Sequence, residues 1–294
     1  MEQHVKKQLN SGYNADLNKL FEEWKASYEA KEQHLFCEDG LIVKYKDENS
    51  GYDINKKWHD AERKIMFIVK DCPDKWGYDV RRLLTGYEGN EKSQENALKT
   101  RTLQGRTCYF KNIARMLYGL WHMTEDNIGK ELKDQIHNDT TVIQAFNDIP
   151  FAYVEGKKMA GGKRCSPAGL RKALNRDGAF LAREIDILQP NIIVCCDQNG
   201  DIFNSVVKNY FQDRMPCEDA KWDYAYELED GSQCNFRCKL YYYKEDGVLL
   251  FQSYHPSGLG KTEWKIYEEV LSPFRQFFAR YKTFDVVSSA AEKL

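Results

Sequence analysis

The sequence predicts an α/β protein built on a mostly parallel sheet. Four short apolar runs, rich in the β-branched and aromatic residues that buried strands favour, alternate with segments of helical periodicity. These runs are Ile65–Val69, Phe151–Val154, Ile192–Cys196 and Val248–Tyr254. Two Asp-Gly turns, at 230–231 and 246–247, separate aromatic runs in the C-terminal part. They predict a β-meander whose last strand is the fourth apolar run.

The length of 294 residues suits one domain, 1–294, with a sizeable core. Leu17, Leu20, Phe21 and Trp24 recur at helical spacing and predict an amphipathic helix over about residues 13 to 32. The segment 35–45 alternates around an Asp-Gly pair at 39–40, which predicts a hairpin or a short extended pair. We therefore expect residues 1–60 to form a cover of helix and hairpin, and residues 60–275 to form the core.

Further helices follow from periodicity and from capping residues. One is expected over about residues 105–122 and another over 263–281. Ser166 followed by Pro167 fits an N-cap with proline at the first helical position, and predicts a helix toward Leu174. A separate helix is expected around Leu181 to Leu188, ended by the proline at 190.

Composition limits the classes of partner. The net charge is −2, the isoelectric point is near 6.3 and the mean hydropathy is −0.69. A general polyanion binder is excluded, so any contact with nucleic acid must come from a local basic patch. The first residues, Met1 to Lys7, have no apolar segment behind them. We expect a soluble cytoplasmic protein with no membrane partner.

The nine cysteines are odd in number, and most lie inside apolar runs, as Cys195 and Cys196 do. They are interpreted as reduced, buried thiols. Cys234 and Cys238 have a C-x3-C spacing that could ligate zinc, but no second ligand pair is near and the pair falls on a predicted strand. Packing is the preferred interpretation, and no metal or other cofactor is expected.

Three predicted strands end in polar residues: Asp71, Glu155 and His255. In an open α/β sheet, the loops at the carboxyl ends of parallel strands meet and bind ligands. An acid and a histidine on two such loops predict a two-group active site. The alternatives are that Asp71 caps its loop and that His255, which precedes a proline, is a turn residue.

These strand ends resemble the uracil-DNA glycosylase superfamily. The segment Val69–Pro73 is similar to the family's strand followed by Gly-acid-x-Pro, with lysine in place of glycine. His255–Ser257 is similar to its final His-Pro-Ser. Between them, Phe151–Pro167 resembles the family's strand with a recognition Asn, a Lys and a downstream Ser/Thr-Pro, and Leu188–Val194 resembles its Pro-x-hydrophobic strand entry.

The resemblance spans roughly residues 60 to 275. It implies a three-layer α/β/α sandwich with a central, mostly parallel, four-stranded sheet, here extended by the β-meander. It also implies cleavage of an N-glycosidic bond in DNA after base flipping. The catalytic residues would be Asp71, stabilising the sugar cation and positioning water, and His255, stabilising the base anion through the pyrimidine O2. Iron–sulfur members carry a close cysteine pair near the N-terminus, which Cys37 lacks, so no cluster is expected.

Glu155 stands where the family usually has the recognition Asn. An ionised glutamate offers only acceptors, which repel uracil O4 and suit the exocyclic amine of cytosine. The alternative is that Glu155 forms a salt bridge with Lys157 or Lys158. After Asp71, uracil-specific members often place a Tyr that crowds C5, and this chain has a longer loop. Cys72, Trp76 and Tyr78 in that loop are expected to contribute to base recognition, with Trp76 or Tyr78 stacking on the base.

An enzyme that excised ordinary cytosine would destroy its own genome, so a cytosine reader needs a further mark. Hydroxymethyl or glucosylated hydroxymethyl groups on phage DNA would supply one, and the superfamily includes phage-defence members that act on such bases. The expected partner is double-stranded DNA, without an obligatory protein partner. The expected DNA contacts are Lys157, Lys158, Lys163, Arg164, Ser257, Leu259 and Lys261.

Other interpretations stay open. The basic loop at 156–164 could be solvated, and Leu259 could be a wedge in the DNA stack or could pack on Trp264. The closest rival function is ordinary removal of uracil. A non-catalytic module that binds a base or nucleotide is a second class, because altered motifs are also typical of an inactive site. Hydrolysis of a nucleoside is a third.

Overall fold

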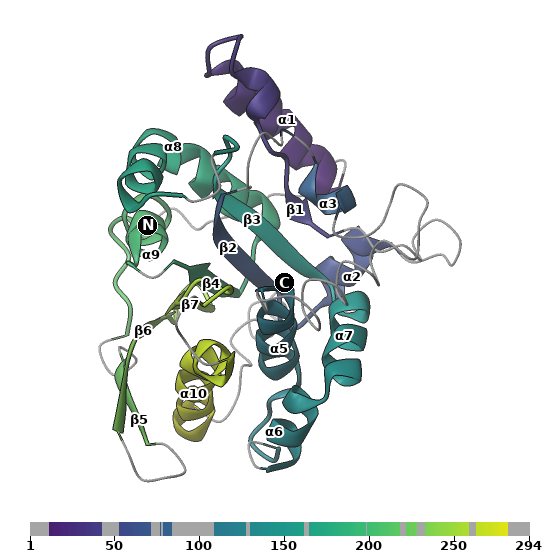
Figure 1. The fold of residues 1–294 in the computed structure, drawn as a ribbon, viewed down its shortest axis with the longest axis vertical. Helices are drawn as coiled ribbons and strands as arrows, with labels where there is room; N and C mark the ends of the chain where they lie inside the picture. Colours follow the sequence, from purple (N-terminus) through teal and green to yellow (C-terminus); the bar gives the residue numbers. More distant parts are fainter. Residues whose placement is uncertain are drawn as a thin grey trace.

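A seven-stranded mixed sheet runs through the centre of the computed structural model (Figure 1). Its order is β1-β3-β2-β4-β7-β6-β5. The structure describes residues 12–42, 53–71, 77, 79–83, 109–127, 130–161, 165–197, 199–217, 222–227, 233–258 and 263–281. The strands are β1 (Gly40–Leu41), β2 (Ile65–Asp71), β3 (Phe151–Lys157), β4 (Ile192–Cys196), β5 (Trp222–Glu227), β6 (Gln233–Tyr243) and β7 (Val248–Ser253).

The α/β class is confirmed, but the prediction of a four-stranded sheet is wrong. β3, β2, β4 and β7 are neighbours and run parallel. β6 and β5 continue the same sheet as an antiparallel meander from β7, and β1 adds an antiparallel edge beside β3. The turn between β6 and β7 contains the expected Asp-Gly pair, and its Gly247 has φ 66°, a left-handed conformation that glycine adopts without strain. The Asp-Gly pair at 230–231 lies outside the described residues.

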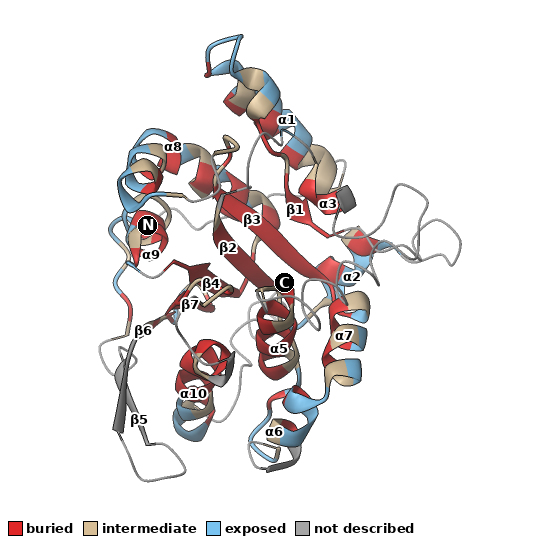
Figure 2. Cartoon of the chain, in the orientation of Figure 1, coloured by how far each residue is buried: buried red, intermediate tan, exposed pale blue. Residues whose placement is uncertain are grey.

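Helices cover both faces of the sheet. They are α1 (Tyr13–Ala26), η1 (Gln33–Leu35), α2 (Ile54–Asp60), α3 (Val80–Leu83), α5 (Tyr109–His122), α6 (Lys130–His137), α7 (Asp139–Asp148), α8 (Pro167–Leu188), α9 (Asp201–Val206), η4 (Val207–Phe211) and α10 (Glu263–Tyr281). Side chains of α5, α6, α7 and α10 pack in one core, and those of α1, α2, α8 and α9 pack in the other. The strands between the two cores are buried (Figure 2).

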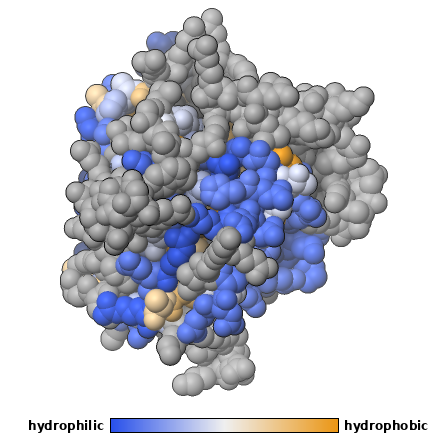
Figure 3. All heavy atoms as spheres, turned by 60° about the horizontal axis from the view of Figure 1, so that its bottom comes forward, coloured by the Kyte–Doolittle hydropathy of each residue, from blue (hydrophilic) through white to orange (hydrophobic). Residues whose placement is uncertain are grey.

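Alternation along the strands assigns each side chain to one core. Phe67 and Val69 of β2 face the core of α5 and α10, whereas Met66 and Ile68 face the core of α1 and α8. The outer helix faces are polar: Figure 3 shows mainly hydrophilic residues among the coloured atoms on the side below the sheet in Figure 1. Within the described residues, no helix has the length and apolar character needed to cross a bilayer.

One local expectation is corrected. The helices expected near Leu174 and around Leu181–Leu188 form one 22-residue helix, α8. Its N-cap is the expected Ser166, whose Oγ accepts a hydrogen bond from the Gly169 N–H at 3.0 Å. In the described part of the segment 35–45, expected to be a hairpin or a short extended pair, β1 pairs with β3; residues 43–45 lie outside the described residues.

Candidate functional site

The carboxyl ends of β2, β3, β4 and β7 lie at one edge of the sheet. Asp71 is opposite Lys157, Ile68 is opposite Cys195, and Cys196 is opposite Ser253. β3 lies on one side of β2 in the sheet, and β4, the next strand along the chain, lies on the other side of β2. The direction in which strands are added therefore reverses between β2 and β4. Ligands bind at such a switch point in open α/β sheets. Asp71 ends β2, and His255 follows β7, whose distance from β2 is about 10 Å at the usual strand spacing.

The contacts of His255 with Ser257 favour one tautomer of its ring. Its Nδ1 accepts a hydrogen bond from the Ser257 main-chain N–H at 3.3 Å and lies 2.7 Å from Ser257 Oγ. An acceptor Nδ1 in a neutral imidazole leaves the proton on Nε2. The turn that holds Ser257 is closed by the Gly258 N–H, which donates to the His255 carbonyl at 2.8 Å. The local sequence His-Pro-Ser-Gly thus builds a turn that orients a donor Nε2–H.

The environment keeps this imidazole uncharged at neutral pH. Burial and, to a smaller extent, the positive charge of Lys70 at the end of β2 together lower the pKa of His255 from 6.5 to about 4. A neutral imidazole with its proton on Nε2 can donate one hydrogen bond to a developing anion. It does not need to release a proton first.

Two residues of α5 that the sequence interpretation missed surround His255. The Tyr109 ring centroid lies 5.3 Å from that of His255, and the Tyr109 hydroxyl lies 2.7 Å from the Tyr153 hydroxyl on β3. Asn112, which is 1% exposed, donates from Nδ2 to the Pro256 carbonyl at 2.8 Å. Asn112 interrupts the apolar face of α5, and a buried polar residue at such a position is a usable sequence signal.

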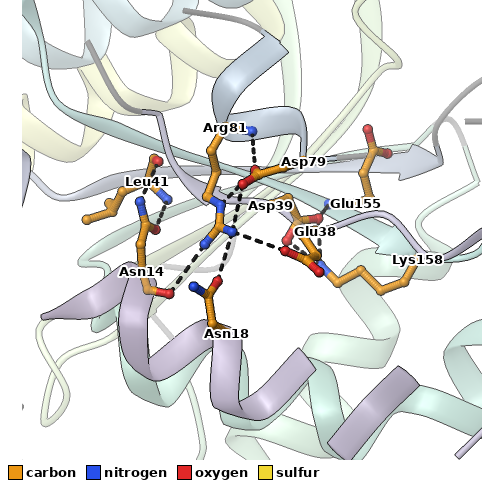
Figure 4. Close-up of polar contacts among 9 residues, drawn as sticks. All are labelled: Asn14, Asn18, Glu38, Asp39, Leu41, Asp79, Arg81, Glu155 and Lys158. Atoms are coloured by element: carbon orange, nitrogen blue, oxygen red, sulfur yellow. Dashed lines mark hydrogen bonds and ion pairs between the residues drawn. The ribbon is translucent and has the colours of Figure 1, made fainter. Parts of the chain in front are cut away.

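Glu155 lies on the same face of the sheet as this aromatic group. It follows Tyr153 by two residues along β3, so alternation places both side chains on the side of α5. Its side chain points away from the Asp39 carboxylate in Figure 4, while its main-chain N–H donates to Asp39 Oδ2 at 2.6 Å. Of the two lysines considered as its salt-bridge partner, Lys158 pairs with other carboxyl groups.

Asp197, directly after β4, is a further acid at this edge that the sequence interpretation missed. It is 1% exposed, and its carboxylate accepts the main-chain N–H groups of Asp201 at 2.6 Å and Ile202 at 3.1 Å. Burial raises its pKa to about 6, while those two hydrogen bonds and Lys70 act in the opposite direction. The sequence signal that could have revealed Asp197 is an acidic residue at the end of a buried strand, the same signal that identified Asp71.

One predicted DNA contact is wrong. Lys158 is fully buried, and its Nζ lies 2.6 Å from Asp39 Oδ2 and 2.8 Å from Glu184 Oε2, so it cannot reach a phosphate group. Lys157 is half-buried, and its Nζ donates to the Met159 carbonyl at 2.5 Å. Its DNA contact stays a prediction.

Several predicted residues are not described. Cys72, Trp76, Tyr78, Lys163, Arg164, Leu259 and Lys261 lie outside the described residues. Only the backbone is described for Asp71 and for the two cysteines of the C-x3-C pair. Among the described side chains, no group of three His, Cys, Asp or Glu residues is arranged to hold a metal ion.

Comparisons with known proteins do not name the site. No protein-family model matches the chain, and no curated protein matches it.

Proposed function

We propose that this protein is a DNA glycosylase that hydrolyses the N-glycosidic bond of a flipped, modified cytosine. The observation that carries the proposal is the turn that holds His255 at the same sheet edge as Asp71, where Nδ1 faces the Ser257 N–H and the lowered pKa favours a neutral imidazole. A neutral imidazole that donates from Nε2 suits a leaving group that gains negative charge.

In the proposed reaction, the C1′–N1 bond breaks and its electron pair leaves with the base. The Nε2–H of His255 donates to the pyrimidine O2 and stabilises the resulting anion. The Asp71 carboxylate stabilises the cationic sugar and orients a water molecule, whose oxygen bonds to C1′. The water proton passes to Asp71 and then to solvent, and the base anion takes a proton from solvent.

The preference for cytosine rests on Glu155. A carboxylate accepts hydrogen bonds from an exocyclic amine and repels a carbonyl oxygen, so it favours cytosine N4 over uracil O4. Cytosine N3 is also an acceptor and opposes an ionised carboxylate, so Glu155 must approach N4 alone. A modification at C5, such as a hydroxymethyl or glucosylated hydroxymethyl group in phage DNA, would separate the target from ordinary cytosine.

The test is incubation with duplexes that carry uracil, cytosine, hydroxymethylcytosine or glucosylated hydroxymethylcytosine, followed by alkali to cut abasic sites. We expect strand breaks only with the modified cytosines. Breaks only with uracil would support the rival uracil glycosylase and refute the role of Glu155. Tight binding without breaks would indicate a binding module.

Variants of the two acting residues make the test specific. Asp71→Asn and His255→Ala are each expected to lower the single-turnover rate by about a hundredfold or more. Asp60→Asn and His59→Ala are matched controls, because both residues are exposed on α2, which leads into the opposite end of β2. Equal rates in all four variants would refute the assignment.

Glu155→Asn tests base selection separately. It should weaken cleavage of the modified cytosines, because an unpaired polar contact in a built site can cost roughly 10⁴-fold. Some cleavage of uracil should appear, since the amide offers a donor and an acceptor. An unchanged substrate preference would contradict the acceptor argument.

A further inference from the structure

The end of β3 is held by a residue that lies outside the strand. Asp39, in the loop before β1, is fully buried and accepts the Glu155 main-chain N–H through Oδ2 at 2.6 Å (Figure 4). This hydrogen bond joins residues 116 positions apart in the sequence. The short distance is typical of a charge-assisted bond, which is stronger than a neutral one.

Asp39 is itself fixed in place by a buried cation. The Lys158 ammonium lies 2.6 Å from both oxygens of Asp39 and 2.8 Å from Glu184 Oε2. It also lies 5.3 Å from the Phe21 ring centroid and 5.1 Å from that of Trp24. Burial and the Asp39 charge raise the pKa of Glu184 well above its usual range, and the Lys158 ammonium opposes that rise.

The neighbouring residue, Glu38, holds the chain on the other side. Its carbonyl accepts the Val80 N–H at 2.8 Å. The main chain of Glu38 also forms an isolated parallel β-bridge with that of Asp79. Arg81, which is 4% exposed, binds Asp79 through Nε at 2.8 Å and Asn18 Oδ1 through Nη2 at 2.8 Å (Figure 4). Glu38 and Asp39 thus connect the end of β3 with the segment that begins α3.

We propose that Asp39 is a positioning residue for Glu155 and thereby sets which base the site accepts. The inference rests on the proposed function, because it takes Glu155 as the reader of the base. A reading carboxylate must be held within about 0.5 Å of its productive position. The Asp39 bond acts on the main chain of Glu155 and so fixes where its side chain starts.

Asp39→Asn tests the positioning role. The asparagine can direct its oxygen to the Glu155 N–H only by turning its amide NH₂ toward the Lys158 ammonium, so donor faces donor and the bond weakens. Glu184→Gln is the matched control, since Glu184 contacts the same ammonium, whereas the Glu155 N–H donates to Asp39. Both variants disturb the buried cation, and only the first disturbs β3.

Two readouts separate positioning from stability. In Asp39→Asn, the preference for modified cytosine over uracil should fall by about tenfold or more. Exchange of the Glu155 amide hydrogen should speed up by a similar factor, because the variant loses a hydrogen bond to a charged group. In Glu184→Gln, measured below the melting temperature of both variants, preference and exchange should stay within about twofold of wild type. An unchanged preference in Asp39→Asn, with an active wild type, would overturn the inference.

A double variant covers the case in which Asp39→Asn fails to fold. Asp39→Asn with Lys158→Met removes the ammonium that opposes the amide, so the Glu155 N–H regains its acceptor and both readouts should return toward wild type. Further loss in the double variant would overturn the positioning role. A wild type that releases no base from any of the DNAs would instead refute the proposed function, and with it the role of Asp39 in selection.

Discussion

Lys158→Met should destabilise the protein strongly, because Lys158 is the shared counterion of two fully buried carboxyl groups, Asp39 and Glu184. Removing one partner of a buried pair costs about 3–5 kcal/mol. Unfolding entropies near 2.1 cal/mol/K per residue give about 0.6 kcal/mol/K for a chain of 294 residues. The melting temperature should therefore fall by about 5–8 °C at pH 7.

The size of this loss should depend on pH. In the wild type, the Lys158 ammonium is the counter-charge of the buried carboxyl pair and opposes the rise in the pKa of Glu184. Without that charge, we expect the pair to take up one more proton in the folded protein than in the wild type, and the unfolded chain releases this proton above about pH 4. The folded state of the variant then binds more protons than its unfolded state, so its stability relative to wild type falls by about 1.4 kcal/mol per pH unit as the pH rises.

Urea unfolding at pH 5, 6 and 7 measures this slope. Asp39→Asn with Lys158→Met is the matched control, because it removes the ammonium and one carboxyl group together and binds no extra proton. The control should show no added slope relative to wild type. A Lys158→Met variant with a wild-type midpoint, or with a loss that is equal at all three pH values, would refute the role of Lys158 as the counter-charge of the two buried carboxyl groups.

Three further outcomes are expected. The pKa of His255 is lowered to about 4 in the folded protein, so the unfolded chain binds a proton first as the pH falls from 6.5. The free energy of unfolding of wild type should therefore fall by up to about 3 kcal/mol between pH 6.5 and 4, and melting curves of His255→Gln should lack this loss. Gly119→Ala places a Cβ 2.5 Å from Leu271 Cδ1, which should cost about 1–3 kcal/mol in urea unfolding and be partly restored by adding Leu271→Ala; an additive double variant would contradict the clash. Asn112→Ala removes the bond to the Pro256 carbonyl and should slow single-turnover cleavage about five- to tenfold, whereas an unchanged rate would show that the turn holds His255 without it.

The strands and the meander could be predicted because their signals are local. The run Ile192–Cys196 forms β4 with the expected bounds, since β-branched residues buried on both faces have few other stable arrangements. Turn and capping residues also act over a few positions, as Ser166 does at the start of α8. Local patterns reach their limit at α8, where the sequence suggested two helices and the structure has one. Gly178, in the middle of α8, is buried against the Asn209 side chain, a contact that the local pattern does not show.

The sequence by itself located the parallel strands and so brought Asp71, Glu155 and His255 toward one edge of a sheet, although β3 runs on to Lys157 and keeps Glu155 inside the strand. The tertiary structure alone decided what those residues contact. Lys158 resembles a solvated loop lysine in its local sequence, and it is buried because Asp39, 119 positions away, provides its counterion. A charge can be removed from water only where distant residues supply an opposite charge and hydrogen bonds, and such partners are not encoded in the pattern around it.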